Sequence, residues 1–163
     1  MLDRLRQGRY AIEKVLGDGA QGTTFAAMDH QAGHRVAIKR FDVRGARSWK
    51  DVELAEREAK VLASLSHPRL PRYLEHFEED GALYLVMELL EGESLASFLR
   101  RGGRLDEASI VRLLAAASRV LDYLHTRTPP VIHRDLKPGN VIRRPDGDFA
   151  FVDFGAVRDK LRP

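Results

Sequence analysis

Three polar residues of different chemistry lie close together in the sequence, between two pairs of apolar residues. Asp135, Lys137 and Asn140 are flanked by Val131-Ile132 and by Val141-Ile142. Because the apolar pairs anchor both ends of the loop in a core, we expect its polar side chains to be held in place. A carboxylate, an ammonium group and a carboxamide that converge on one spot are suited to act as base, cation and metal ligand.

A glycine-rich turn lies near the N-terminus. Glycines at positions 17, 19 and 22 have the spacing G-x-G-x-x-G, which occurs both in dinucleotide-binding folds and in a lid over ATP phosphates. The dinucleotide form needs a helix directly after the glycines, whereas Thr23-Thr24-Phe25 favours a strand. The sequence therefore predicts a hairpin whose backbone N–H groups approach phosphate, with an ordinary glycine hairpin as the alternative.

A lysine on the next predicted strand is a candidate for the same phosphate site. Alternate residues of a strand point to the same side, so Ala37 and Lys39 of Val36-Ala37-Ile38-Lys39 share a face. The small alanine leaves room for a flat ring, and the lysine offers a cation to phosphate. A lone lysine is usually exposed, but a place behind a glycine hairpin favours the binding role.

A carboxylate that would pair with Lys39 is predicted on the helix that follows, over residues 51–65. The apolar stripe of this helix, at spacings of three and four, consists of Val52, Ala55, Ala59, Leu62 and Leu65. Glu58 lies on the stripe, whereas Glu56 lies on the opposite side. A buried carboxylate is costly unless it is paired, so we expect Glu58 to hold Lys39. A position at the solvated edge of the stripe is the alternative.

The remaining patterns predict the elements that must position these residues. Strands are expected over 10–16, after the glycines, and over 35–41, 73–78 and 82–87, with a tight Asp80-Gly81 turn between the last two. Further helices are expected over 94–101 and 106–127, the latter with Asp106 as a plausible N-cap. The longer helix is expected to bury a stripe of Ile110, Leu114, Ala117, Leu121 and Leu124. A hairpin turn at 145–148 then leads to a strand that delivers Asp153.

Composition narrows the class of protein. The chain has 163 residues, of which 44% are hydrophobic and 31% charged, with a net charge of +3 and no cysteine. These values fit a soluble globular protein without disulfides or thiolate metal sites. The densest basic group, Arg100, Arg101 and Arg104, is better explained as a solvated helix end than as a nucleic-acid site. The sequence has no apolar run of signal-peptide or membrane-spanning length, so a cytoplasmic protein is expected.

Taken in order, these motifs make the chain resemble the eukaryotic-like protein kinases, and it looks most like the bacterial serine/threonine kinases. The resemblance rests on the glycine turn, on Lys39 and Glu58, on the loop from His133 to Asn140, and on Asp153-Phe154-Gly155. It implies an α+β, protein-kinase-like fold: a small five-stranded antiparallel sheet lobe with one helix, followed by a truncated, mainly helical lobe. The implied domains are 1–87, a hinge at 88–92, and 93–163.

The resemblance also implies ATP, Mg²⁺ and a protein substrate with a serine or threonine hydroxyl. Asp135 would accept the hydroxyl proton, Lys137 would stabilise the γ-phosphate, and Lys39, held by Glu58, would pair with the α and β phosphates. Asn140 and Asp153 would hold Mg²⁺. The implied contacts with ATP are Leu16, Gly17, Asp18, Gly19, Ala20, Gln21, Gly22, Thr23, Thr24, Ala37, Lys39, Met87, Glu88, Leu90 and Ile142.

The chain departs from the family pattern in two residues and in length. Thr24 stands in place of the usual valine and Gln21 in place of a common aromatic residue, which should alter packing on ATP more than remove binding. The family continues well beyond residue 163, so we expect a fragment of a longer chain. The alternatives are a nucleotide-binding regulatory module, an inactive kinase fragment that lacks the substrate-binding half, and a small-molecule kinase. Leu136-Lys137-Pro138 favours a protein substrate over the last, and the oligomeric state is left open.

Overall fold

The chain forms two compact units. The computed structural model describes residues 4–19, 22–42, 56, 59–133 and 135–152. One unit takes in Met1–Ser64 and Arg72–Leu89, and the other takes in Leu65–Pro71 and Leu90–Pro163. The segment Leu65–Pro71 therefore interrupts the first unit in sequence while it packs with the second.

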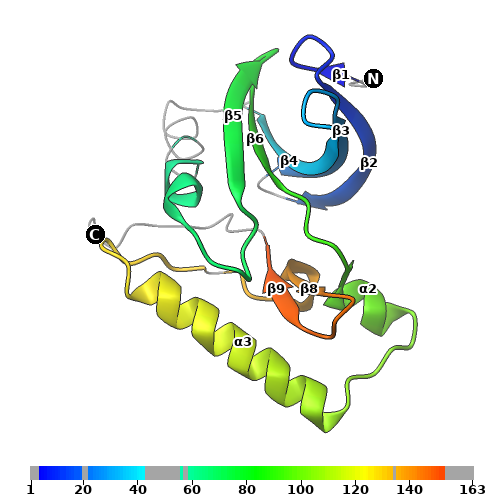
Figure 1. The fold of residues 1–163 in the computed structure, drawn as a ribbon, viewed down its shortest axis with the longest axis vertical. Coiled ribbons are helices and arrows are strands. Elements are labelled where there is room, and N and C mark those ends of the chain that lie inside the picture. The colour runs from blue at the N-terminus through cyan, green and yellow to red at the C-terminus, as the bar shows by residue number, and fades with distance from the viewer. Residues whose placement is uncertain (1–3, 20–21, 43–55, 57–58, 134, 153–163) are drawn as a thin grey trace. The chain divides into compact units, whose positions relative to one another are not determined.

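The first unit is built on one antiparallel sheet, which curls in Figure 1. Its strand order is β1-β2-β3-β4-β6-β5. The five expected strands are present, and a two-residue strand, β1, extends the sheet beyond β2. The strands are β1 (Arg4–Leu5), β2 (Tyr10–Gly19), β3 (Gly22–Asp29), β4 (His34–Asp42), β5 (Tyr73–Glu79) and β6 (Ala82–Glu88). Asp80 and Gly81, both at positive φ, make the predicted tight turn between β5 and β6.

The core of this unit is a layer of aliphatic and aromatic side chains on one side of the sheet. The ring of Phe77 stacks on Tyr84, with centroids 5.1 Å apart, and on Tyr10 at 5.9 Å. The buried members are Leu5, Tyr10, Ala27, Val36, Ile38, Ala82, Tyr84 and Val86. Burial of this apolar area is the main force that holds β2, β4 and β6 together.

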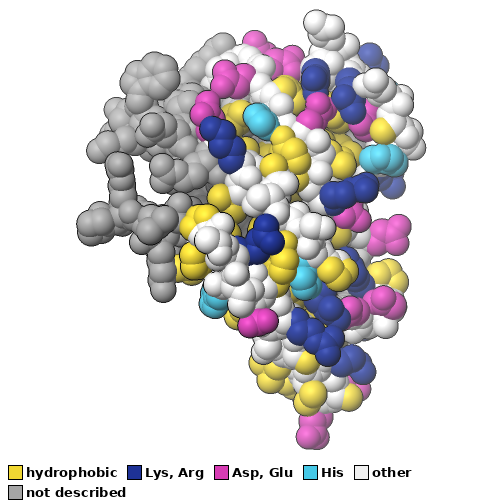
Figure 2. All heavy atoms as spheres, turned by 60° about the vertical axis from the view of Figure 1, so that its left-hand side comes forward, with side chains coloured by type: hydrophobic (Ala, Val, Ile, Leu, Met, Phe, Trp, Pro, Cys, Tyr) yellow, Lys and Arg dark blue, Asp and Glu magenta, His cyan; other side chains and the backbone are white. Residues whose placement is uncertain are grey.

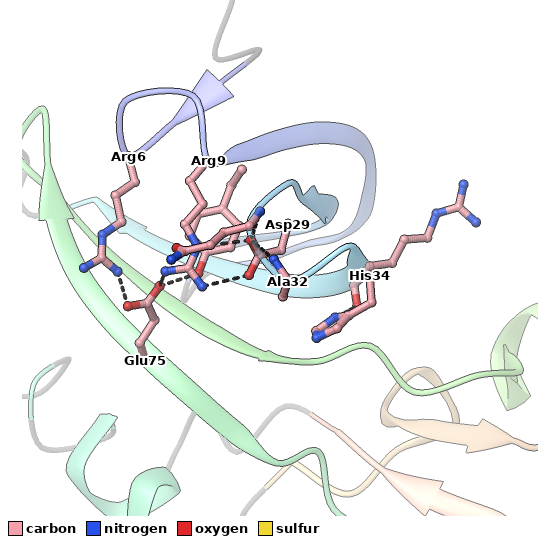
Figure 3. Close-up of polar contacts among 9 residues, drawn as sticks. Arg6, Arg9, Asp29, Ala32, His34 and Glu75 are labelled. Atoms are coloured by element: carbon pink, nitrogen blue, oxygen red, sulfur yellow. Dashed lines mark hydrogen bonds and ion pairs between the residues drawn. The ribbon is translucent and has the colours of Figure 1, made fainter.

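Charged side chains tie the turn between β1 and β2 to distant strands of the same sheet. Figure 3 shows Arg9 directed at Asp29 on β3, with Nε–Oδ1 and Nη2–Oδ2 distances of 3.0 and 2.8 Å. Arg6 and Arg9 both pair with Glu75 on β5. The Arg9 guanidinium and two backbone N–H groups lower the pKa of Asp29 to about 2, against the opposing effect of its burial. The carboxylate therefore stays ionised inside the fold.

The second unit combines two helices with a small antiparallel sheet. The elements are β7 (Glu93–Ser94), α2 (Leu95–Arg100), α3 (Glu107–His125), a 3-10 turn η1 (Pro138–Asn140), β8 (Val141–Arg143) and β9 (Phe149–Phe151), and the sheet order is β7-β8-β9. Ser94 caps α2, because its hydroxyl oxygen accepts the backbone N–H of Ser97. Asp106 caps α3 in the same way, by accepting the backbone N–H of Ser109. The predicted cap at Asp106 is confirmed, and Figure 1 shows α3 as the longest helix of the unit.

The predicted buried stripe of α3 is wrong in its first half. Leu124 is fully buried, but Ile110 and Leu114 are 46% and 61% exposed. The helix packs against β9 and buries Ala116, Val120 and Leu124. Within the described part of the chain, no element covers the turns that carry Ile110 and Leu114, so periodicity located an apolar stripe without locating its partner.

Residues 59–64 are helical, and Ala59, Leu62 and Leu65 of the predicted stripe are buried, whereas Glu56 is exposed. Figure 2 shows basic and acidic side chains interspersed over the visible surface of the described residues. Every helix among those residues is too short or too polar to span a lipid bilayer.

Candidate active site

Asp135, Lys137 and Asn140 converge in the second unit, as their spacing predicts. Lys137 Nζ lies 2.8 Å from Asp135 Oδ2, and Asn140 Nδ2 donates to the same oxygen at 3.0 Å. Asn140 Nδ2 also donates to the Asp135 backbone carbonyl at 2.9 Å. The apolar flanks anchor this loop, because Val131 and Val141 are each 5% exposed. The loop therefore holds its three polar side chains against one another.

The surroundings of Asp135 keep its carboxylate ionised. The hydrogen bond from Lys137 is the largest influence that lowers the pKa of Asp135, and the positive charge of Lys137 and the amide of Asn140 lower it further, against partial burial. The Asp135 backbone N–H donates to the carbonyl and Nδ1 of His133, at 2.9 and 3.3 Å. His133 is almost fully buried, so it fixes the backbone before the carboxylate.

Asn140 is placed to offer an oxygen to a cation. It is 6% exposed, and its amide nitrogen is taken up by Asp135, so its carbonyl oxygen Oδ1 is the atom left for a ligand. Amide and carboxylate oxygens are the ligands that Mg²⁺ prefers, and the donor set of Asn140 and Asp153 fits that ion. Asp153 lies outside the described residues. Among the described residues, no group of three or more His, Cys, Asp and Glu side chains is arranged to hold a metal.

The glycine turn joins β2 to β3 as the predicted hairpin. Gly19 pairs with Gly22, and Asp18 pairs with Thr23, whose hydroxyl donates to the Asp18 carboxylate at 2.8 Å. A side chain at Gly22 would bring its Cβ within 2.0 Å of the Arg40 carbonyl oxygen, whereas one at Gly17 would meet no described atom within 4 Å. Ala20 and Gln21 lie outside the described residues.

Lys39 lies on β4, beside the hairpin. Lys39 is 3% exposed, and it lies opposite Thr24 in the register of β4 with β3. Its Nζ lies 4.8 Å from the centroid of the Phe41 ring. Ala37 is also buried and pairs with Met87 on β6. The strand pattern predicted that the two residues share a face, and both are buried, as are Val36 and Ile38 of the same strand. Glu58, the expected partner of Lys39, lies outside the described residues.

The remaining predicted contacts with ATP are divided between the two units. Leu16 is 45% exposed on β2, and Ile142 is half-buried on β8. The backbone N–H of Glu88 already donates to the Arg72 carbonyl at 2.8 Å, so a ligand would have to displace that bond to use it. Leu90 follows β6 and is half-buried.

One contact of the second unit had no signal in the sequence. Arg69 Nη2 donates to both carboxylate oxygens of Asp148, at 3.1 and 2.9 Å. The two residues are 79 positions apart, and neither belongs to a motif that predicts the other. Only the folding of Leu65–Pro71 onto the second unit brings them together.

Known proteins match this chain along most of its length. A family model for the protein kinase domain matches residues 10–161. The chain is 38% identical over 165 residues to serine/threonine-protein kinase B of Synechocystis sp., covering 94% of this chain and 28% of that protein. It is 33% identical over 156 residues to serine/threonine-protein kinase PknA of Mycobacterium tuberculosis, covering 93% and 36%. It is also 33% identical over 168 residues to PknA of Nostoc sp., covering 98% and 29%.

The chain thus spans between 28% and 36% of the length of these relatives. The match to the family model covers nearly all of the residues that form the two units. The α+β fold, with its curled antiparallel sheet followed by helices and a short hairpin, agrees with that match. This chain belongs to the protein kinase family, and its relatives are bacterial serine/threonine-protein kinases.

Proposed function

We propose that the chain carries the catalytic residues of a serine/threonine protein kinase, which transfers the γ-phosphate of ATP to a protein hydroxyl. The observation that carries the proposal is the arrangement of Asp135, Lys137 and Asn140, which share one carboxylate oxygen at 2.8 and 3.0 Å. An ion pair alone is a common surface feature. Here the ion pair is joined to a buried amide, on an anchored loop of a chain that belongs to the kinase family. This combination favours a catalytic role over that of a surface ion pair.

The first unit would hold the triphosphate. The backbone of the hairpin at Gly17–Gly22 is proposed to cover the phosphates, because glycine allows the main chain to approach a ligand closely. Lys39 would pair with the α and β phosphates, and Glu58 would orient it. Flat apolar cover for the adenine ring would come from Leu16, Ala37, Met87 and Ile142, with backbone groups of Glu88 and Leu90 as hydrogen-bond partners.

The second unit would carry out the transfer. Asp135 would accept a hydrogen bond from the substrate hydroxyl and direct its oxygen at the γ-phosphorus. A bond forms between that oxygen and phosphorus while the bond from phosphorus to the ADP oxygen breaks, and the hydroxyl proton passes to the Asp135 carboxylate. Because the pKa of Asp135 is lowered, its main contribution is orientation, with proton transfer late in the step.

Charge neutralisation would complete the site. Lys137, 2.8 Å from Asp135, would place a positive charge beside the γ-phosphate as negative charge moves to the leaving group. Bound Mg²⁺ would supply further charge neutralisation on the phosphates, with Asn140 and Asp153 as its protein ligands. The amide of Asn140 would then serve both groups, through Nδ2 to Asp135 and through Oδ1 to the cation.

Replacing the proposed base provides the test. Asp135→Asn removes the proton acceptor but keeps the shape of the side chain, so phosphorylation of a mixed serine and threonine peptide library should fall by about 10²–10⁴-fold. ATP affinity, measured by calorimetry, should change little because Asp135 is not proposed to contact ATP. Asp122→Asn, an exposed position on α3, is the matched control and should retain full turnover.

The outcomes separate the candidate functions. Equal turnover by Asp135→Asn and the parent chain would contradict the assignment. Binding of ATP without any turnover by the parent chain would favour the nucleotide-binding module instead. Phosphorylation of a small molecule but of no peptide would overturn the assignment of a protein substrate.

A further inference from the structure

Two arginine side chains of the second unit lie over a single phenylalanine ring. The guanidinium carbon of Arg143, on β8, is 4.5 Å from the centroid of the Phe98 ring, and that of Arg101, which follows α2, is 5.1 Å from it. The Phe98 residue is 8% exposed, so little of the ring is open to a ligand. A planar guanidinium held against a ring is already ordered, and it loses less conformational freedom when it binds an anion.

One carboxylate serves both arginines. Arg101 donates to the two carboxylate oxygens of Glu93, at 3.1 and 2.5 Å. Arg143 Nη1 lies 3.9 Å from the same carboxylate, beyond hydrogen-bonding distance. The side chains of Arg101 and Arg143 are 61% and 38% exposed. Because an arginine has five N–H donors, both residues keep donors for a further carboxylate.

Two more arginines belong to the same stretch of chain. Arg100 is the last residue of α2, and Arg104 follows Gly103, where a Cβ would lie 2.5 Å from the Phe98 ring. Both arginines are exposed, and neither side chain forms a hydrogen bond or ion pair within the described residues. We call Arg100, Arg101, Arg104 and Arg143 the arginine cluster. Its four positive charges face the single negative charge of Glu93.

Other acidic residues border the arginine cluster in sequence but do not neutralise it. Glu91 precedes β7, and Asp106 and Glu107 lie at the start of α3. The Asp106 carboxylate is taken up by the backbone N–H of Ser109 as the helix cap. In the described part of the chain, none of these three acidic residues forms an ion pair with the cluster. Positive charge therefore exceeds negative charge at this surface.

The arginine cluster lies next to the loop that carries the proposed reaction centre. Glu93 lies opposite Arg143 in the register of β7 with β8. Both β7 and α2 contact η1, which ends at Asn140, and Figure 1 shows α2 beside β8. Arg143 comes three residues after Asn140, which is about 10 Å along an extended strand. An extended peptide spans about 3.3–3.6 Å per residue, so a substrate with its hydroxyl at Asp135 would reach the cluster about three residues away.

An ordinary solvated helix end explains the exposed arginines at the end of α2 but not the place of Arg143. That residue comes from a separate strand, and its guanidinium shares the Phe98 ring with Arg101. A single-stranded nucleic acid would need exposed aromatic rings for its bases, and Phe98 is buried. A peptide carboxylate fits better, because guanidinium groups bind carboxylates through two parallel hydrogen bonds, as Arg101 binds Glu93.

We propose that the arginine cluster selects acidic protein substrates, by binding a glutamate or aspartate about three residues from the hydroxyl that is phosphorylated. The inference rests on the proposed function. Glu93 competes with the substrate carboxylate for the same guanidinium groups. Its removal should therefore strengthen the binding of an acidic peptide, whereas removal of Arg101 or Arg143 should weaken it.

The test uses two series of fluorescent peptides that differ only in the charge of one residue. Each peptide has a single serine and carries Glu, Gln or Lys three residues before it in one series, or three residues after it in the other. Fluorescence anisotropy measures binding to the full 163-residue chain at low ionic strength, without nucleotide. In one series the Glu peptide should bind about three- to tenfold more tightly than the Gln peptide, and added salt should reduce the difference.

Three variants and a control locate the site. The preference for Glu over Gln should fall in Arg143→Gln and be less than about twofold in the double variant Arg101→Gln/Arg143→Gln. Glu93→Gln should bind the Glu peptide at least about twofold more tightly than the parent chain does, because the competing carboxylate is gone. Arg119→Gln, an exposed position on α3, makes the same change in charge and should keep the preference of the parent chain.

Several results would overturn the proposal. One is a Glu peptide that binds no more tightly than the Gln peptide in both series, and another is a preference that persists in the folded double variant. If circular dichroism shows that the double variant does not fold, Glu93→Gln decides, and equal or weaker binding of the Glu peptide by that variant overturns the site. Tighter binding of oligo(dT) than of the Glu peptide, lost in Arg143→Gln, would assign the cluster to nucleic acid instead.

Peptide phosphorylation separates this proposal from the proposed function. The preference for the Glu peptide should appear in KM rather than in kcat, because the arginine cluster lies about 10 Å from the reacting atoms. No transfer of phosphate to any peptide, with the binding preference intact, would contradict the kinase assignment for this chain and leave a site for acidic peptides. Transfer with equal KM for the Glu and Gln peptides would contradict the selection of acidic substrates alone.

Discussion

Two glycines of the β2–β3 hairpin share a motif but differ in what surrounds them. Gly22 has φ +123°, and its Cβ would lie 2.0 Å from the Arg40 carbonyl oxygen. Gly17 lies on the exposed side of β2, where a Cβ would meet no described atom within 4 Å. The fold itself therefore requires glycine at position 22, whereas only a ligand would require it at position 17.

Alanine at each position should separate these two roles. Gly22→Ala should lower the free energy of unfolding by at least about 2 kcal/mol, because the left-handed backbone and the clash with Arg40 both add strain. Gly17→Ala should leave it unchanged within about 0.5 kcal/mol but weaken ATP affinity. Denaturant unfolding and calorimetry measure the two effects. An equally large loss of stability in both variants would contradict this distinction.

At the scale of single residues, local sequence patterns predicted the local geometry of several residues correctly. The strand that carries Ala37 and Lys39, the Asp106 cap and the convergence of Asp135 with Lys137 follow from short-range patterns. Such patterns work because strand alternation, helix capping and short loops depend on neighbours in the chain. The pair of Arg69 and Asp148 depends on no local pattern, and it was missed.

At the scale of elements, α3 shows what periodicity leaves undetermined. Ile110, Leu114, Ala117, Leu121 and Leu124 lie on one stripe, as predicted. Only the end of the stripe near Leu124 is covered by described elements, and the beginning is exposed. A hydrophobic stripe indicates that burial against another element is favourable. Which element covers the stripe depends on the tertiary arrangement.

Replacing a leucine by alanine should therefore affect stability differently at the two ends of α3. Leu124→Ala should cost about 2–5 kcal/mol of stability, because it leaves a cavity in a fully buried site. Leu114→Ala, on the same helix but 61% exposed, should change stability by less than about 0.5 kcal/mol. Thermal or denaturant unfolding of the two variants checks the comparison. A large loss at Leu114 would show that its part of the helix is covered.

At the scale of the whole molecule, carboxylates with hydrogen-bonded or charged partners make stability depend on pH. Their pKa values are lowered by hydrogen bonds and by neighbouring arginine and lysine residues. The affected groups, spread over both units, are Asp29, Glu75, Glu93, Asp106, Asp135 and Asp148. A carboxyl group with a lowered pKa in the folded state stabilises the fold above its unfolded pKa, and this stabilisation is lost as the pH falls.

Asp29 should make the clearest single contribution. Its pKa falls from an ordinary value of 3.8 to about 2, so it should contribute about 2 kcal/mol above pH 4 that disappears as the pH approaches 2. Asp29→Asn should remove that part of the acid dependence, measured by denaturant unfolding at several pH values. Asp80→Asn, at an exposed turn, is the control. Identical pH dependence in Asp29→Asn and the parent chain would contradict the role of the pair with Arg9 (Figure 3).

The sequence alone determined the order of strands and helices, the glycine hairpin and the set of polar residues in the 135–140 loop. These features follow from side-chain spacing, turn chemistry and capping, which act over a few residues. The tertiary structure decided that Leu65–Pro71 packs with the second unit, that Arg69 meets Asp148, and that the described elements leave the beginning of the stripe on α3 exposed. Contacts between residues far apart in the chain depend on how all the elements pack together, and no local pattern encodes them.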